Sequence, residues 1–445
     1  MNELDARALP PDDPQRRTLH NEVHARPSAR VRLPALITYV ALLNAGVSRE
    51  QECAHLQRLP GHADLTQDRL QGNFLRLRCE GYTVKWERHT EFTRYSIVQA
   101  LPAHAGWGST LPELASHVAT GTDWLRDLPG ATVAAIHLAM LPEGMDDPQH
   151  LHKAQQWLGE GALIGSRMGN TAEGLPHSCL LTHLRIGADG FERLLVLASP
   201  PTNEGRAGRI SQRVLELETY RLMALRGLPV AKQLSPVLAQ AESQLADITA
   251  QLEGQQGGDQ ALLDQLVALA ARVERATAEH GYRFSATRAY DAVVRERIAE
   301  LRERPLHGTQ TVGEFMQRRL SPAMATVEAT AKRLAALSER VARTSALLRT
   351  RVDIATEAQN QQLLEKLTRG QDLQLRLQST VEGLSIAAIS YYVVSLLLYG
   401  AKALKLAGVP IQPELATGLM IPLVLWGVWK TVQRIHDKLH RDSGR

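Results

Sequence analysis

The pattern of apolar and polar residues changes character near residue 205. Before that point, short apolar or alternating runs are typical of β-strands, and turn residues separate them at Glu80-Gly81 and over 187–190. We expect residues 74–98 to form a pair of strands. Further strands are predicted over 132–140, 162–168, 178–186 and 191–198. Helices are expected over 34–44, 47–58, 111–119 and 148–158. This mixture predicts an N-terminal α/β domain over residues 1–205.

After residue 205 the pattern becomes helical. Helices are expected at about 206–226, 230–252, 260–279 and 286–302, which together make a helical hairpin region over 206–310. The next segment, 311–383, begins with a capping box and continues with residues at alternating spacings of four and three from Leu320 to Ala355, which are apolar except for Ser338 and Ser345. It is therefore predicted to be a long stalk helix, similar to a coiled coil, with Gly370 as its hinge. Its apolar seam needs a partner, either the helices of 230–302 or another subunit.

Two uncharged runs follow the stalk. Nineteen consecutive residues from Gly383 to Ala401 carry no charge, and fifteen more follow from Leu415 to Trp429. A helix needs about 20 apolar residues to cross a bilayer. We therefore predict a transmembrane helical hairpin over 384–429 and a basic tail over 430–445, so the fold class is α+β and mostly helical. Two buried helices of a soluble domain are the alternative.

The distribution of basic residues predicts the orientation of this hairpin. Only Lys402 and Lys405 lie in the loop between the two runs. Seven basic residues flank the hairpin outside: Arg369, Arg376, Lys430, Arg434, Lys438, Arg441 and Arg445. Basic residues favour the cytoplasmic side, so both chain ends are expected to be cytoplasmic. The predicted location is therefore a membrane, with the lipid bilayer as a partner.

Charge and cysteine content exclude several classes of protein. The chain has 51 basic and 47 acidic residues, a balance that argues against a dedicated nucleic-acid binder. Its three cysteines include no close pair, which indicates a reducing compartment. No acidic residue lies within either uncharged run, so a proton or ion relay through the hairpin lacks an evident carrier.

Two short segments are dense in ionisable residues. The first contains Glu22, His24 and Arg26, and the second contains Glu87, His89 and Glu91. On a strand, the alternation of side chains would place Glu87, His89 and Glu91 on one face, with Trp86, Arg88 and Phe92 on the other. Such a row could ligate a divalent metal or support acid–base chemistry, and the first segment would add ligands if the two segments met. The alternative is an exposed face whose acids pair with arginines such as Arg26, Arg30 and Arg94. Neither a catalytic residue nor a cofactor follows from the sequence beyond this metal hypothesis.

Small and polar residues form a stripe on the first predicted span. The stripe consists of Ala388, Tyr392, Ser395 and Tyr399. Stripes of this kind mediate contacts between helices in membranes. We expect it to face either the second span or a neighbouring subunit.

Four segments together resemble one family of bacterial proteins. They are NEVHARP (21–27), KWERHTEF (85–92), EFMQRRLSPAM (314–324) and LSIAAISYYVVSLLLYGAKAL (384–404). The family is uncharacterised, and the resemblance implies a membrane-anchored protein of unknown function in the inner membrane of a bacterium. The arrangement of a cytosolic domain, a long helix and a terminal hairpin is also similar to that of CorA-type divalent-cation transporters. Those proteins carry Gly-Met-Asn after the first span, whereas Tyr399-Gly400 is followed here by Ala401-Lys402.

Three functional hypotheses follow. The favoured one is a non-enzymatic, homo-oligomeric membrane protein whose cytosolic domain acts as a scaffold or sensor. The alternative is a membrane-tethered metal-binding or hydrolytic enzyme that uses the segments around Glu22-His24 and Glu87–Glu91. The third is an ion transporter, which rests on the likeness to CorA-type proteins.

Overall fold

A computed structural model describes residues 12–22, 28–144, 149–169, 176–200, 202–254, 258–407, 410 and 412–442. Two compact units divide the chain. Unit 1 comprises Met1–Gln256 and Asp264–Thr344, and unit 2 comprises Gly257–Leu263 and Ser345–Arg445. The predicted stalk segment 311–383 is thus shared between the two units.

A mixed β-sheet forms the centre of unit 1. Its strands are β1 (Ala35–Leu43), β2 (Phe74–Cys79), β3 (Tyr82–Arg88), β4 (Phe92–Ala100), β5 (Ala131–Leu141), β6 (Ile164–Met168), β7 (Ser178–Ile186), β8 (Glu192–Ala198) and β9 (Arg304–Pro305). Their order across the described part of the sheet is β2-β3-β4-β1-β5-β8-β7-β6-β9. Only β5 and β8 pair in parallel there.

The strand predictions hold at most positions, and three expectations are wrong. The segment 34–44 is strand β1 rather than a helix, and 74–98 supplies three strands rather than two. The expected helix over 111–119 is reduced to a single 3₁₀ turn at Ala115–His117. The turns at Glu80-Gly81 and over 187–190 connect β2 to β3 and β7 to β8, as predicted.

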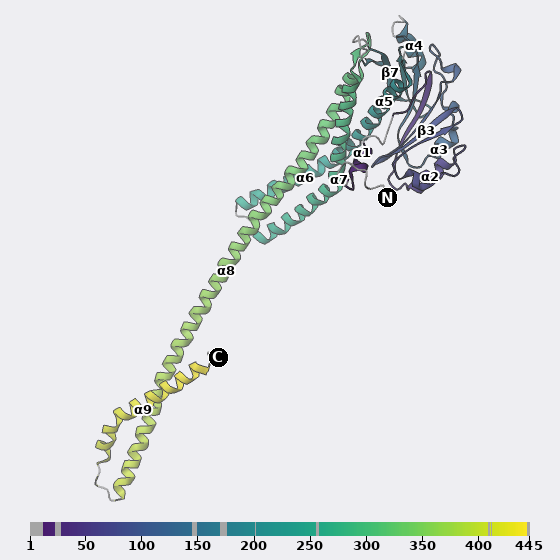
Figure 1. Ribbon diagram of the computed structural model, residues 1–445. Helices are drawn as coiled ribbons and strands as arrows, with labels where there is room; N and C mark the ends of the chain where they lie inside the picture. Colours follow the sequence, from purple (N-terminus) through teal and green to yellow (C-terminus); the bar gives the residue numbers. More distant parts are fainter. Residues whose placement is uncertain are drawn as a thin grey trace, which may run out of the picture. The chain divides into compact units, whose positions relative to one another are not determined.

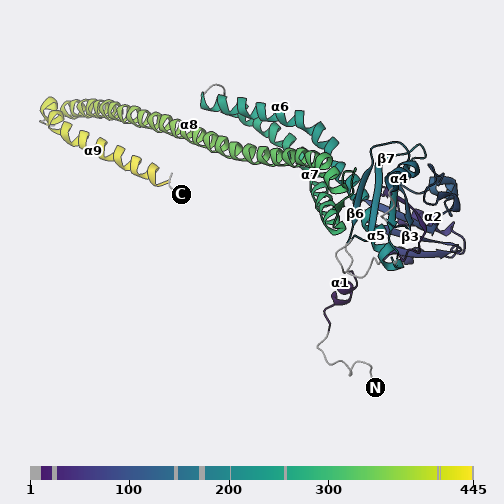
Figure 2. The ribbon, with the colours of Figure 1, turned by 90° about the horizontal axis from the view of Figure 1, so that it is seen from above.

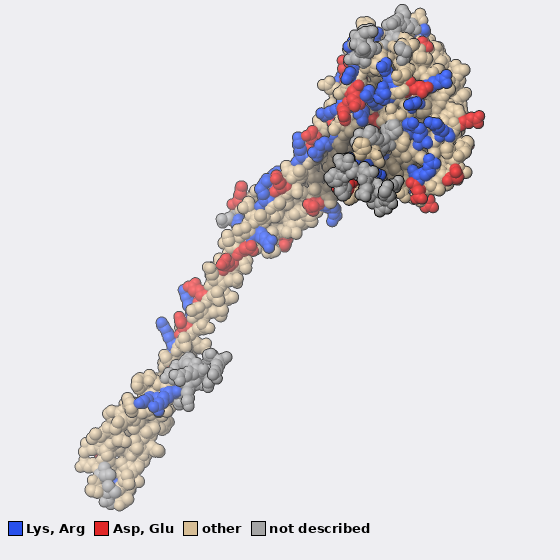
Figure 3. All heavy atoms as spheres, viewed as in Figure 1, with Lys and Arg blue, Asp and Glu red and all other residues tan. Residues whose placement is uncertain are grey.

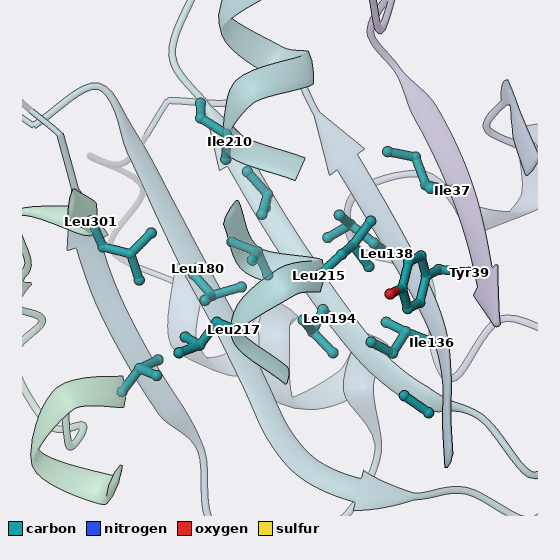
Figure 4. Close-up of a cluster of buried hydrophobic side chains, with 14 of the residues drawn as sticks. Ile37, Tyr39, Ile136, Leu138, Leu180, Leu194, Ile210, Leu215, Leu217 and Leu301 are labelled. Carbon is teal, nitrogen blue, oxygen red and sulfur yellow. The ribbon is translucent and has the colours of Figure 1, made fainter. Parts of the chain in front are cut away.

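One face of the sheet is covered by helices from later in the chain. These are α5 (Glu204–Leu225), α7 (Asp259–Leu301) and the beginning of α8 (Val312–Leu406). In Figure 4, Ile210, Leu215 and Leu217 of α5 lie over strand residues such as Ile136 and Leu194. The same apolar cluster continues to Met316 and Met324 of α8. Residues far apart in sequence therefore make this core.

The opposite face carries shorter helices in two clusters. Around β2, β3 and β4, apolar side chains pack with α2 (Arg49–Gln57) and α3 (Thr122–Arg126) about the buried Trp86 and Trp124. Around β5, β7 and β8, α4 (His150–Leu158) contributes the buried Trp157. The described helix α1 (Arg16–Glu22) is outside both clusters.

Long helices follow the sheet. α6 (Gly227–Glu253) lies beside α7 and the first part of α8 in both views of the ribbon (Figures 1 and 2). Arg333 of α8 bonds Glu242 of α6 at 2.8 Å, and the seam residues Val327, Leu334 and Val341 are buried. The seam of α8 within unit 1 is therefore covered by α6 and α7, the first of the two expected partners. α7 is one continuous helix, not two, and α8 continues through Gly370 without a break.

Unit 2 contains the apolar end of the chain. Helix α8 and the following α9 (Pro413–Asp442) each contain a stretch long and apolar enough to cross a membrane. Only 6% of each stretch is buried, whereas helices in the core of a soluble domain would be mostly hidden. Figure 3 shows hardly any charged side chain on the visible face of this end of the unit.

Candidate functional site

The first predicted cluster is only partly described. Glu22 is the last residue of α1, and its side chain is not described. His24 and Arg26 lie outside the described residues. Whether this segment meets the second segment therefore stays a prediction.

The second predicted cluster does not form the expected row. Strand β3 ends at Arg88, and residues 89–91 turn into β4, with the His89 amide donating to the carbonyl of Phe92 at 2.8 Å. The alternation of a strand is therefore lost after Arg88, before His89 and Glu91. Glu87 is buried, His89 stacks on Phe92 at 4.5 Å, and Glu91 reaches α7. Among the residues that the structure describes, no three His, Cys, Asp or Glu side chains gather as metal ligands would.

Glu87 instead belongs to a buried ionic network. The register of the sheet places Glu87 opposite Arg94, and their side chains form an ion pair. Lys85 lies 3.0 Å from Glu87, and Arg94 also reaches Glu216 of α5 at 3.3 Å. Arg297 of α7 is the last member of the network and lies 2.8 Å from Glu216. The expected pairing with Arg94 is correct, but it occurs in the interior rather than on an exposed face.

This network joins the sheet to the helices that cover it. Burial alone would raise the pKa of Glu87, but the charges of Arg94 and Lys85 outweigh that effect and lower it. Removing one member would leave a buried charge unpaired, which costs about 3–5 kcal/mol. The network is thus a structural tie between β3, β4, α5 and α7.

A cavity of about 540 Å³ opens next to the β3–β4 turn. It lies between that turn, α2, α5 and α7, all within unit 1. Its lining consists of Arg49, Asn73, Arg88, His89, Thr90, Phe92, Tyr220, Ala289, Tyr290 and Val293. Small-molecule sites have volumes of roughly 300–1,000 Å³, so this cavity is of a suitable size.

Two arginines line one side of this cavity. Arg88 is paired with the buried Glu52 at 2.8 Å and donates to the carbonyl of Val47. Arg49 donates to the carbonyl of Leu70 and, at 2.7 Å, to the side-chain oxygen of Asn73. Both partners of Arg49 are neutral. Among the described residues no carboxylate lies within ion-pair distance of its guanidinium.

Aromatic rings line the other side. Tyr220 of α5 and Tyr290 of α7 are stacked, with ring centres 5.8 Å apart and planes inclined by 22°. The edge of Phe92 meets Tyr220 at 6.1 Å, and His89 is stacked on Phe92. The Tyr290 hydroxyl donates to Glu91 at 2.8 Å, and Arg283 binds the same carboxylate. These bonds hold the Tyr290 ring in position.

A second group of buried ionisable residues lies between β8 and α5. Arg221 donates three hydrogen bonds to Glu218, two from Nε at 2.8 and 3.0 Å and one from Nη2, and Glu192 lies 3.7 Å from the same arginine. Burial and the neighbouring Glu218 raise the pKa of Glu192 to about 8. A carboxyl group with this pKa holds its proton at neutral pH.

The stripe predicted on the first apolar stretch does not face α9 in this chain. Tyr392 and Tyr399 are 71% and 70% exposed. The buried residue of the stretch is Ser390, and the less exposed positions Ile386 and Val394 lie on the same helical face as Ser390. Of the stripe formed by Ala388, Tyr392, Ser395 and Tyr399, only Ser395 is part-buried, and the other three residues are exposed in the chain by itself. A neighbouring subunit stays a prediction.

Sequence reasoning missed most of the cavity. Its lining comes from α2, β4, α5, α7 and their connections, and no local motif unites Arg49, Asn73, Tyr220 and Tyr290. The one usable signal was the density of ionisable residues in KWERHTEF, which marks the β3–β4 turn.

A family model described as "Protein of unknown function (DUF3422)" matches residues 11–439. The chain belongs to the DUF3422 family. The match includes the sheet, the long helices and both apolar stretches, so a DUF3422 protein contains all of these parts. No curated protein and no solved structure matches the chain. The similarity to CorA-type transporters therefore stays a prediction from the order of the segments.

Proposed function

We propose that this DUF3422 protein is a membrane-anchored, self-associating scaffold or sensor of the bacterial inner membrane. Its sheet domain would lie in the cytoplasm together with both chain ends. The observation that carries the proposal is the second part of α8, where a helix with an exposed leucine seam continues without a break into the first apolar stretch. Ion transport and hydrolysis have no comparable support.

The apolar stretches support attachment to a membrane. Their side chains are exposed within the chain, and a bilayer would remove this surface from water. The excess of Lys and Arg outside the hairpin supports the cytoplasmic position of both ends.

The exposed seam of α8 supports self-association. Residues at spacings of four and three form one face of the helix: Leu363, Leu367, Gly370, Gln374, Leu377, Val381 and Leu384. The five apolar side chains among them are at least 57% exposed. Repeats of this kind bury their apolar residues by pairing with other helices.

A second copy of the chain is the partner that fits best. The seam ends where the first apolar stretch begins, so copies in one membrane have the same orientation. Their identical seams are then in register, as parallel helix pairing requires. Gly370 and Gln374 interrupt the apolar face and would weaken, but not abolish, the contact.

Light scattering of the full-length protein in detergent tests this proposal. The wild-type protein is expected to be an oligomer, and the double variant Leu367→Glu/Leu377→Glu is expected to be monomeric because it places like charges in the seam. Leu375→Glu is the matched control, because Leu375 is equally exposed but lies off the seam. A monomeric wild-type protein, or an equal effect of all these substitutions, would rule the proposal out.

A further inference from the structure

We propose that the cavity at the β3–β4 turn binds a small molecule that combines a flat aromatic ring with an anionic group, the chemistry of a mononucleotide. This inference goes beyond the proposed scaffold or sensor role. It depends only on residues of unit 1 and not on membrane attachment or self-association.

The charge of the lining selects an anion. No acidic residue is among the cavity's lining residues, whereas Arg49 and Arg88 are. Arg88 is neutralised by Glu52, and Arg283 near the cavity is neutralised by Glu91. Arg49, in contrast, forms no ion pair with any carboxylate that the structure describes. Its two neutral hydrogen bonds hold the planar guanidinium in place, and guanidinium groups bind phosphate and carboxylate through paired hydrogen bonds.

The aromatic side of the lining selects a flat ring. Tyr220 of α5 and Tyr290 of α7 are part-exposed at the cavity, whereas Phe92 is only 1% exposed and packs against Tyr220 and His89. The two tyrosine rings are therefore the surface on which a flat ligand can stack. Stacking of a nucleobase on an aromatic side chain stabilises binding by about 1–3 kcal/mol. A cation held by these rings is a poor alternative, because the charge of Arg49 would repel it.

The arrangement of the lining argues against two simpler ligands, a free inorganic anion and an uncharged aromatic molecule. A free inorganic anion would use Arg49 and leave the rings uncovered, and an uncharged aromatic molecule would leave the charge of Arg49 unpaired. Only a molecule with both groups satisfies both sides of a cavity of about 540 Å³.

Calorimetric titration of the full-length protein in detergent tests the inference. The probes are the four common nucleoside 5′-monophosphates, the corresponding uncharged nucleosides and inorganic phosphate. At least one monophosphate is expected to bind saturably, and its nucleoside and phosphate are each expected to bind at least tenfold more weakly. Light scattering on the same samples reports the oligomeric state separately, so failure here is distinguishable from failure of the scaffold proposal.

Variants assign the binding to this cavity. Arg49→Gln is expected to weaken binding at least tenfold, and Arg49→Lys, which keeps the charge, less so. Arg58→Gln is the matched control, because Arg58 ends the same helix but pairs with Asp127 outside the cavity. Tyr290→Leu removes a ring and is expected to weaken binding, whereas Tyr290→Phe keeps the ring and is expected to retain most of it.

Three results would overturn the inference. They are no saturable binding of any of the four monophosphates, equal effects of Arg49→Gln and Arg58→Gln, and binding of phosphate as tight as that of the nucleotides. Thermal unfolding of each variant shows whether it is folded. If Arg49→Gln or Tyr290→Leu does not fold, the conservative variants Arg49→Lys and Tyr290→Phe still test the inference.

Discussion

At the scale of single residues, Glu192 makes stability depend on pH. Its pKa is raised to about 8 in the folded protein, against an ordinary value of 4.5. Between these values the folded state binds a proton that the unfolded state has lost, so stability falls as pH rises. A single such group changes the free energy of unfolding by up to about 1.4 kcal/mol per pH unit.

Glu192→Gln should remove this dependence, because glutamine resembles the protonated carboxyl group. The variant is expected to match the wild type near pH 5 and to be more stable at pH 9. Unfolding in urea at both pH values measures the difference. A variant that is less stable than the wild type at pH 9 would show that ionised Glu192 stabilises the fold through Arg221.

At the scale of elements, α5 approaches the chain before β1 very closely. A methyl group at Gly208 would lie 1.6 Å from the carbonyl oxygen of Ala29, which no side chain can tolerate. Gly208→Ala is therefore expected to destabilise unit 1 by about 1–3 kcal/mol, as overpacked substitutions do.

Gly205→Ala in the same helix is the control, because its methyl group would have ordinary contacts of 3.7 Å. Thermal unfolding of both variants separates loss of close packing from any effect of helix propensity, which would act on both. Equal stability of the two variants would contradict the close approach.

Elements differ in how well the sequence predicts them. Strands β7 and β8 were recognisable because turn residues bound them, whereas β1 was mistaken for a helix. β1 lies between β4 and β5 and is covered on both faces, with Leu36 and Ile37 in opposite core clusters. A strand buried on both faces has no polar alternation, so its apolar run does not distinguish it from a buried helix.

At the scale of the whole molecule, the proposed topology predicts where a protease has access. Lys366, Arg369 and Arg376 are exposed on α8 and lie before the first apolar stretch. With the sheet domain in the cytoplasm, trypsin should cut there in inside-out membrane vesicles and release an N-terminal fragment. In right-side-out vesicles these three sites should be protected, and trypsin should reach only the loop that contains Lys402 and Lys405.

Mass spectrometry of the released fragments identifies the cut sites. The monomeric variant Leu367→Glu/Leu377→Glu should be cut several-fold faster than Leu375→Glu, because pairing protects a helix from local opening. Cleavage at Lys366, Arg369 or Arg376 in right-side-out vesicles, but not in inside-out vesicles, would show the opposite orientation.

The candidate site is predictable only in part, because its residues come from segments that meet only in the folded domain. The sequence drew attention to residues 85–92, which do form one wall of the cavity and one end of the ionic network. It does not show that Tyr220 and Tyr290 complete the cavity or that Glu216 and Arg297 complete the ionic network. These four residues are more than a hundred positions away from the turn. Their proximity depends on helices α5 and α7 crossing the sheet.

The long separation within this core also determines the order of events during synthesis. All strands except the two-residue β9 are complete by Ala198, yet the cluster on their helix-covered face extends to Met324. Between those two points the growing chain carries a finished sheet with one apolar face bare. The apolar stretch at 383–401 leaves the ribosome only after that interval. We therefore expect translation speed and chaperone supply to affect the yield of folded protein mainly while residues 199–324 are being made, before the first apolar stretch is available to the proposed membrane.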